Sequence, residues 1–322
     1  MSEQDAIKPA ANGPKWQHYV PCCYLKFFAH DGVWNNGRNS QVYFTDGKKS
    51  LCVPVKDVGA DDYTYSKEFP EFDHNFNDME RDYPLITKKI MDAATLTKKE
   101  YYQFILIMGD FNIRNVAYEN KTDQERKEVY QAMSRAFNED LFGEVGGDGT
   151  NLQEMMDWFA EHWRLQPFRS NSGEKFITSD NPSKIFSHPR SGCPVMIYLP
   201  IHPDFAVVAF DKRHLQVVGK EISDDALGVL NGIQAHRCVR HVFSDHDILN
   251  GDDQESTEKL KNLLERKKPK RHFTRDGTWV RDFISTSESV FDRLTFIKKP
   301  GNRILGDAVR RAISDMDSNR NS

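Results

Sequence analysis

The chain has 322 residues, of which 38% are hydrophobic and 29% are charged. This length allows one large domain or two small ones, and the composition excludes global disorder. The formal net charge of -4 excludes an overall attraction to nucleic acid or to anionic membranes. A polyanionic partner would therefore have to meet a local basic patch.

The cysteines and the first residues bear on where the protein works. The five cysteines are Cys22, Cys23, Cys52, Cys193 and Cys238. They form no C-x-x-C pair, so neither a disulfide scaffold nor a thiolate zinc site is predicted. No apolar run reaches the roughly 20 residues that span a bilayer. Residues 1–14 lack the apolar core of a signal peptide and predict a flexible leader. We therefore expect a cytoplasmic location and no membrane partner.

The first distinctive stretch is residues 16–29, WQHYVPCCYLKFFA. It combines a polar Gln17-His18 pair, a helix-starting Pro21 and an apolar run. Aromatic and apolar neighbours around His18 indicate a buried or cleft-facing imidazole. Short strands joined by turns are then predicted at residues 41–44 and 51–55.

The central region predicts helices. Apolar residues recur at steps of three and four from residue 73 onward, and Pro84 falls inside that pattern, where it predicts a kink or a new helix start after Asp82. Capping-box patterns begin at Thr97, Thr122 and Thr150, and each should open a helix. The last of these helices carries Phe159 and Trp163, and a glycine-rich linker at residues 143–149 precedes it.

The following part of the chain is rich in β-formers. Short strands are predicted at residues 175–178, 195–199, 205–210, 215–218 and 241–244, with a helix from Ser223 to Ala235 before the last. The expected fold class is α+β, with a helical central region and short antiparallel strands on either side in sequence. Those strands could pair into one sheet. We expect the main domain at residues 15–244 and a charged, partly helical C-terminal extension at 245–322.

Four spots place polar groups where an apolar pattern would be simpler. They are His18, Glu80, Arg114 and Asp180. Glu80 and Arg114 share helix faces with apolar residues, and Asp180 follows a strand in the Thr-Ser-Asp-Asn-Pro turn. Because this polar intrusion recurs on successive elements, we predict that all four side chains meet in one pocket.

At these residues the chain resembles a family of bacterial proteins known only as domain of unknown function 4238. Its members open on a Q-H-Y-V-P block followed by Y-L and F-A, as residues 16–29 do. Further matches are Glu80 ahead of a helix, the helix ending in Arg114, and the F-I-T-S-D-N-P block at 176–182. The L-P-I-H-P turn and the closing helix and strand complete the resemblance to residue 244. Cys22-Cys23 and His202 depart from the family pattern. The resemblance implies membership but no mechanism, because the family has no assigned activity.

Three interpretations of the four residues stay open. In the first, which needs no metal cofactor, Glu80 takes a 2′-hydroxyl proton, His18 protonates the leaving oxygen and Arg114 neutralises the phosphorane. In the second, His18, Glu80 and Asp180 bind a divalent metal such as manganese, iron or zinc. In the third, all four are structural. The leading hypothesis is a nuclease-like toxin or defence effector, and the alternative is a non-catalytic ligand-sensing or protein-binding module.

Two further features are weaker candidates. Cys22-Cys23 beside His18 suggests a thiol–imidazole pair, but adjacent residues do not easily face one base, and buried free cysteine is common. The basic run at residues 266–275 could bind nucleic acid phosphates as a local basic patch. The competing interpretation of that run is a solvated tail balanced by nearby acidic residues.

Overall fold

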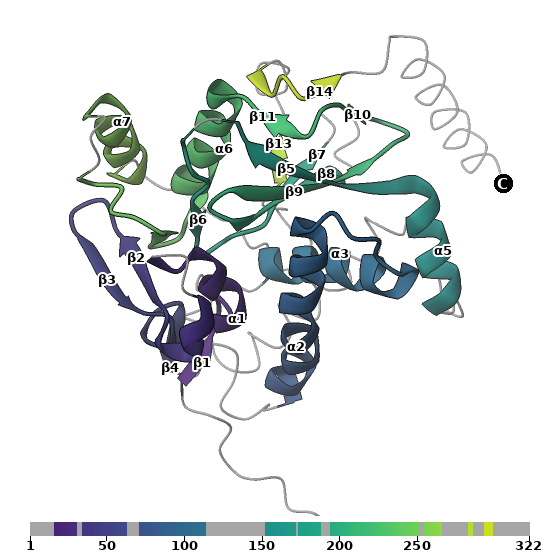
Figure 1. The fold of residues 1–322 in the computed structure, drawn as a ribbon, viewed down its shortest axis with the longest axis horizontal. Helices are drawn as coiled ribbons and strands as arrows, with labels where there is room; N and C mark the ends of the chain where they lie inside the picture. The colour runs from purple at the N-terminus through teal and green to yellow at the C-terminus, as the bar shows by residue number, and fades with distance from the viewer. Residues whose placement is uncertain are drawn as a thin grey trace, which may run out of the picture.

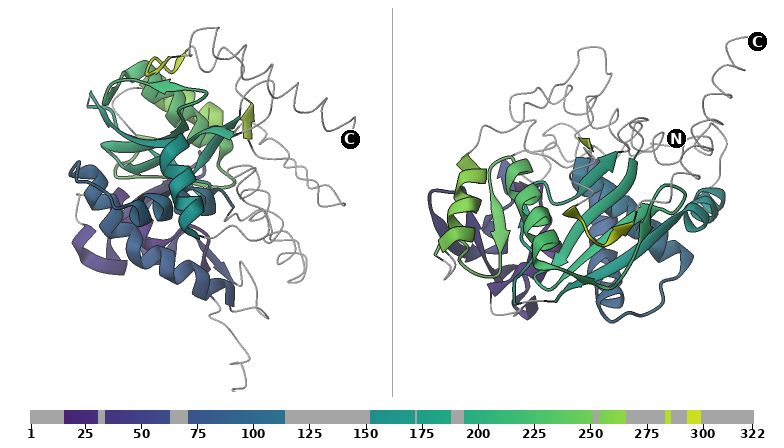
Figure 2. Two further views of the ribbon diagram at one scale, coloured as in Figure 1. Left: turned by 90° about the vertical axis from the view of Figure 1, so that its right-hand side faces the viewer. Right: turned by 90° about the horizontal axis from the view of Figure 1, so that it is seen from above.

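The protein is described from a computed structural model. The described residues are 16–30, 34–62, 71–113, 152–171, 173–187, 194–250, 254–265, 283–285 and 293–298. A six-stranded sheet forms the middle layer, with α2 and α3 on one face and α6 on the other (Figure 1). A four-stranded sheet stands beside it (Figures 1 and 2). The α+β class predicted from the sequence is confirmed.

The six-stranded sheet has the order β11-β5-β9-β8-β7-β13. Its strands are β5 (Trp163–Ser170), β7 (Lys184–Ser187), β8 (Pro194–His202), β9 (Phe205–Asp211), β11 (Glu221–Ile222) and β13 (Phe283–Ser285). The four inner strands pair antiparallel, whereas β11 pairs with β5 and β13 with β7 in parallel. The inner strands thus pair antiparallel as predicted, and the edge strands β11 and β13, which the sequence did not predict, pair in parallel because long connections return the chain in the same direction.

Both faces of this sheet are buried. Along β8, Ile197 and Leu199 join the apolar cluster that includes α2 and α3, while Met196 and Tyr198 join the cluster that includes α6. When both faces of a strand pack against apolar side chains, none of its positions favours a polar residue. This explains why β8 and β9 appear in the sequence as continuous apolar runs.

The helices of the central region begin where their sequence signals lie. They are α2 (Glu71–Met91), α3 (Lys98–Ile113) and α5 (Leu152–His162). The capping box of α3 is confirmed, because Thr97 N donates to Glu100 Oε2 at 2.9 Å and Glu100 N donates to Thr97 Oγ1 at 3.2 Å. The helix predicted from Thr122 and the glycine-rich residues 143–149 lie outside the described residues.

Pro84 does not start a new helix, because α2 runs through it as one helix. Proline removes one backbone hydrogen bond from a helix interior, and tertiary packing can offset that loss. Here Tyr83, Ile86 and Ile90 are all buried in the core. Of the two outcomes predicted at Pro84, the restart after Asp82 is therefore wrong, and the kink stays a prediction.

The four-stranded sheet has the order β3-β2-β12-β6. Its strands are β2 (Gln41–Thr45), β3 (Ser50–Pro54), β6 (Thr178–Ser179) and β12 (Val242–Ser244). It joins strands that precede the helical region to strands that follow it, and all its pairings are antiparallel. The expectation that strands from both sides share one sheet is correct here, although a second sheet also forms.

The remaining described elements are short, apart from α6 and α7. They are β1 (Trp16–His18), α1 (Cys22–Leu25), η1 (Lys26–Phe28), η3 (Trp34–Asn39), η4 (Val55–Asp57), β4 (Ala60–Asp62), β10 (Gln216–Val217), α6 (Asp224–Arg237), α7 (Gln254–Glu265) and β14 (Ile297–Lys298). Helix α6 starts after Ser223, as predicted, but the Ser223 hydroxyl makes no capping bond and lies 3.3 Å from Thr295 Oγ1.

The sequence did not predict the short strands β1, β4, β7, β11, β13 and β14, and the longest described strand that it did not predict is β5. Trp163 was expected to lie within the preceding helix, but it begins this strand instead. The strand contains Arg164, Pro167 and Arg169, so it shows neither alternation nor an apolar run, and proline argues against a strand interior. Its long pairing with β9 supplies the stabilisation that local preference lacks.

Residues beyond 244 contribute to the cores. Leu264 packs with Ile177 and Val242 in one apolar cluster, while Leu294 and Phe296 belong to the cluster beneath α6. Within the described part of the chain, no helix combines the length and apolar character that crossing a membrane would require.

Candidate functional site

The first candidate site is built by the opening block. Strand β1 pairs antiparallel with β4, which sets His18 opposite Ala60. Pro21 then serves as the N-cap of α1, and its carbonyl accepts the N–H of Leu25 at 3.1 Å. This turn brings Cys22 back toward the strand, so that Cys22 Sγ lies 3.1 Å from His18 Nε2.

Charged groups of several elements surround this thiol. Burial raises the pKa of Cys22 to about 11; the Arg38 guanidinium lowers it and the Glu80 carboxylate raises it. Glu80 lies on α2, which packs against α1. His18, Cys22 and Glu80 are all partly exposed, and Arg38 is exposed. The opening block therefore sets an imidazole against a protonated, partly exposed thiol, and the charges of Arg38 on η3 and Glu80 on α2 act on that thiol.

Of the four predicted site residues, His18 contacts Cys22, and the Glu80 carboxylate acts on the pKa of the same thiol, so their meeting in one pocket stays a prediction. Arg114 lies outside the described residues, so its position in the pocket stays a prediction. Cys22 is only a weaker candidate in the sequence, and Arg38 has no sequence signal that selects it. Adjacent cysteines do not easily face one base, but the turn at Pro21 brings Cys22 Sγ to 3.1 Å from His18 Nε2.

The Asp180 carboxylate binds backbone N–H groups. Its side chain is fully buried, and its oxygens accept three backbone N–H groups, from Val239 at 2.6 Å, Arg240 at 2.5 Å and His241 at 2.9 Å. Charge-assisted bonds of this kind are among the stronger ones in proteins. Asp180 therefore anchors the segment that leads into β12.

No metal centre is formed by the described residues: none of their histidine, cysteine, aspartate and glutamate side chains gather in threes or more around a possible ion position. The proposed set of His18, Glu80 and Asp180 does not fit an ion well, because both Asp180 oxygens already accept backbone N–H groups.

The sequence blocks that carried the resemblance meet at Tyr24. Its hydroxyl donates to the carbonyl oxygen of Pro200 at 2.6 Å and lies 2.6 Å from Thr178 Oγ1. Because the tyrosine proton is engaged by the carbonyl, the Thr178 hydroxyl is the donor to Tyr24. The opening block, the F-I-T-S-D-N-P block and the L-P-I-H-P turn are therefore joined by one fully buried phenol.

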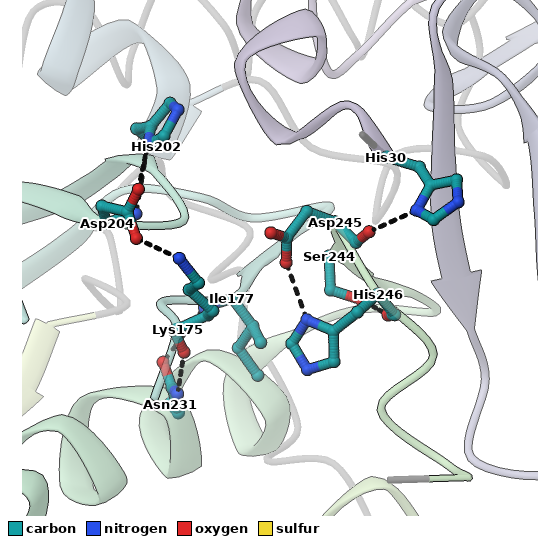
Figure 3. Close-up of polar contacts among 9 residues, drawn as sticks. All are labelled: His30, Lys175, Ile177, His202, Asp204, Asn231, Ser244, Asp245 and His246. Carbon is teal, nitrogen blue, oxygen red and sulfur yellow. Dashed lines mark hydrogen bonds and ion pairs between the residues drawn. The ribbon is translucent and has the colours of Figure 1, made fainter. Parts of the chain in front are cut away.

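A second polar cluster lies where these blocks end (Figure 3). It comprises His30, Lys175, His202, Asp204, Asp245 and His246. Asp204 pairs with Lys175 and lies 3.6 Å from His202 Nδ1, and Asp245 Oδ1 accepts from His246 Nδ1 at 2.7 Å. His30 Nδ1 donates to the Asp245 carbonyl at 3.0 Å.

Two features of this cluster hold it in place. Asn231 on α6 bonds the backbone on both sides of Phe176, donating to Lys175 O at 2.9 Å and accepting from Ile177 N at 3.1 Å. His202 Nδ1 accepts the N–H of Asp204 at 3.1 Å, and burial lowers the pKa of His202 although Asp204 and Asp245 act to raise it. The departure of His202 from the family pattern was the only sequence signal of this cluster.

Comparison with known families gives one match. The model of a protein family of unknown function, DUF4238, matches residues 16–247. The chain belongs to the DUF4238 family. No curated protein and no solved structure matches it. The matched region starts at the first residue of β1 and ends after β12, so it contains both polar clusters and every block on which the resemblance rested.

Proposed function

We propose that this DUF4238 protein is a nuclease-like enzyme that cleaves phosphodiester bonds, acting as a toxin or defence effector. The observation that supports this proposal best is the 3.1 Å contact of His18 Nε2 with the partly exposed Cys22, whose pKa is also raised by the Glu80 carboxylate on α2. A carboxylate and an imidazole at one accessible place provide the base and the acid that metal-free RNA cleavage needs.

In the proposed reaction, the Glu80 carboxylate takes the proton of a 2′-hydroxyl. The oxygen attacks the adjacent phosphorus, and the bond to the 5′-oxygen breaks as protonated His18 gives that oxygen its proton. The products are a 2′,3′-cyclic phosphate and a 5′-hydroxyl. Arg114 and Arg38 are proposed to stabilise the extra negative charge of the phosphorane, because a guanidinium matches phosphate oxygens in geometry.

A cysteine nucleophile is the less favourable assignment for the same site. The reactive form of cysteine is the thiolate. Burial of Cys22 raises its pKa to about 11 even with Arg38 nearby, so the thiol stays protonated at neutral pH. Proton transfer by His18 and Glu80 is therefore the chemistry that we assign.

The alternative function is a non-catalytic ligand-sensing or protein-binding module. It is favoured by Asp180, because both oxygens of its carboxylate accept backbone N–H groups and the side chain therefore has a structural role. Nucleic acid is the partner proposed for the enzyme, with the basic run at 266–275, outside the described residues, as its local basic patch. We place either activity in the cytoplasm, where the free cysteines at 22, 23, 52 and 238 would stay reduced.

The deciding experiment compares matched variants. His18→Ala and Glu80→Gln should each lower the rate of RNA cleavage by about 10²–10⁴-fold, with melting temperatures close to that of the wild type. Glu161→Gln and His162→Ala, on α5, are the controls and should cleave normally. A mixed RNA and DNA pool, with and without EDTA, identifies the substrate and separates the metal-free from the metal-dependent mechanism.

Two results would decide against the proposed active site. If the wild type cuts neither nucleic acid, and His18→Ala and Glu80→Gln melt well below it, both residues are structural and the binding module stands. If cleavage survives in both variants, the activity belongs to another part of the chain.

A further inference from the structure

His202 lies at the tip of the hairpin that joins β8 to β9, and its ring is bonded to the backbone of that tip. Its Nδ1 accepts the N–H of Asp204 at 3.1 Å. The carboxylate oxygen Oδ2 of Asp204 is 3.6 Å from the same nitrogen, which is too far for a hydrogen bond. Because a backbone N–H only donates, Nδ1 carries no proton, and the neutral ring carries its proton on Nε2.

The backbone of the same hairpin tip holds two other segments of the chain. Pro203 O accepts the N–H of Phe176 at 2.7 Å, and Asp204 O accepts the N–H of Ser170 at 3.2 Å. Ser170 ends β5, and Phe176 opens the F-I-T-S-D-N-P block. The Asp204 side chain also pairs with Lys175. The conformation of the hairpin tip therefore sets both ends of the connection from β5 to β6.

We propose that His202 is a pH-sensitive switch: protonation of Nδ1 breaks its bond with the Asp204 N–H and releases the connection from β5 to β6 from the hairpin tip. A protonated Nδ1 is itself a donor, so it cannot stay against a backbone N–H. The Asp204 carboxylate becomes its acceptor, and the ring and the tip must shift to close the 3.6 Å separation. The F-I-T-S-D-N-P block then loses its attachment at its first residue. This switch does not depend on the proposed nuclease activity.

Three charged side chains from three segments act on the His202 ring (Figure 3). Asp204 from the hairpin tip and Asp245 from the segment after β12 favour the protonated ring, whereas Lys175, from the segment before β6, disfavours it. Burial has the largest effect, and it lowers the pKa of His202 below 6.5. The ring is therefore neutral at pH 7 and gains its charge on acidification. With 21% of its side chain exposed, His202 is within reach of solvent protons.

An NMR titration of the full chain from pH 7.5 to pH 5 tests the switch without any ligand. The backbone amide shifts of Ser170, Phe176 and Asp204 should change with the same midpoint as the His202 ring. Once the ring is protonated, the hydrogen-exchange protection of the Ser170 and Phe176 amides, corrected for the intrinsic effect of pH, should fall by roughly two- to twelvefold, as expected for the loss of one hydrogen bond. The Val208 amide, in the middle of β9, should keep its protection.

His202→Asn is the informative variant, because an asparagine side chain accepts the backbone N–H two residues further on and does not titrate. The three amides should lose this titration step in the variant. His214→Asn is the matched control: it removes another buried histidine, located after β9, and should leave the three amides titrating as in the wild type. Asp204→Asn should lower the midpoint of His202, since it removes a carboxylate that favours the charged ring.

Amide shifts that stay constant while the His202 ring titrates would overturn the proposal. A titration step of unchanged size in His202→Asn would overturn it as well. Simultaneous loss of protection at Val208 would mean that acid unfolds the whole sheet, which contradicts a local switch. The comparison of ring and amide midpoints in the wild type needs no variant, so it decides the question even if His202→Asn does not fold.

Discussion

At the scale of single residues, Tyr24 shows how one buried hydroxyl joins three distant segments. Tyr24→Phe would leave the Pro200 carbonyl and the Thr178 hydroxyl without this partner in the core. We expect the variant to lose roughly 1–3 kcal/mol of unfolding free energy, the usual cost of unsatisfied buried polar groups. Urea denaturation followed by circular dichroism measures this directly.

Tyr198→Phe is the matched control for that prediction. Among the described residues, the Tyr198 hydroxyl is buried and has no hydrogen-bond partner. Its removal should leave the stability unchanged or raise it slightly, because no bond is lost and a desolvated hydroxyl disappears. Equal losses in the two variants would contradict the role given to Tyr24.

The histidines His202 and His214 predict a pH dependence of stability. Burial lowers the pKa of both histidines below 6.5. For His202, Asp204 and Asp245 act to raise the pKa and Lys175 acts to lower it. For His214, Asp211 acts to raise the pKa and Arg213 acts to lower it. The unfolded chain therefore binds protons at these rings more readily than the folded protein does. Their contribution is fully present above about pH 6.5 and is lost as the pH falls below it.

Denaturation curves at pH 7.5, 6.5 and 5.5 would measure this dependence. In His202→Asn and in His214→Asn, the free energy of unfolding should fall less between pH 6.5 and pH 5.5 than it does in the wild type. A wild-type stability that rises on acidification through this range would be inconsistent with the burial of both rings.

The sequence predicts part of the candidate site, and the limit has a physical origin. His18 and Glu80 can be selected because each interrupts an apolar pattern. The approach of Cys22 to His18 depends on a turn geometry, and the capture of the Asp180 carboxylate depends on backbone N–H groups of residues 239–241. Neither leaves a mark in the local pattern, since backbone groups are the same at every position except proline.

At the scale of elements, the strand that carries His18 is fixed by Gly59. This glycine has a φ of +66°, and a Cβ there would lie 3.0 Å from Val20 Cβ and 3.1 Å from Val20 O. Gly37 has a similar φ of +61° but open space around it. The two positions separate backbone strain from crowding.

We expect Gly37→Ala to cost about 1–3 kcal/mol, because φ +61° with ψ −133° is a backbone conformation that side chains rarely adopt. Gly59→Ala should cost about 1–3 kcal/mol more, because Val20 and β1 must move. Chemical denaturation of both variants gives the difference. Equal losses of unfolding free energy in the two variants would mean that β1 shifts to accommodate the added methyl group at no energetic cost.

Elements with strong local signals were predictable, and those stabilised by distant partners were not. The capping box of α3 works through residues three positions apart, and it is present as expected. Strand β5 and the parallel edges of the large sheet depend on pairing with segments far along the chain. Such pairing is chosen by the whole fold and leaves little trace in a short window.

At the scale of the whole molecule, the boundary proposed after Ser244 can be tested by truncation. The shortened protein should keep a cooperative melting transition, because most of both large cores lies before this point. Its midpoint should fall, since Leu264, Leu294 and Phe296 leave the clusters in which they are buried. Loss of the cooperative transition would place the end of the folding unit later in the chain.

The parallel pairing of β13 with β7 has a consequence for protein synthesis. On the ribosome, β7 (Lys184–Ser187) emerges well before β13 (Phe283–Ser285), while its other neighbour β8 follows it closely. The backbone N–H and C=O groups on the outer edge of β7 therefore stay unpaired until translation has added nearly a hundred further residues and β13 can pair with them. An open edge of this kind pairs readily with other chains. Slow translation between these two strands should accordingly favour aggregation of the newborn protein, and chaperones that cover strand edges should favour its yield.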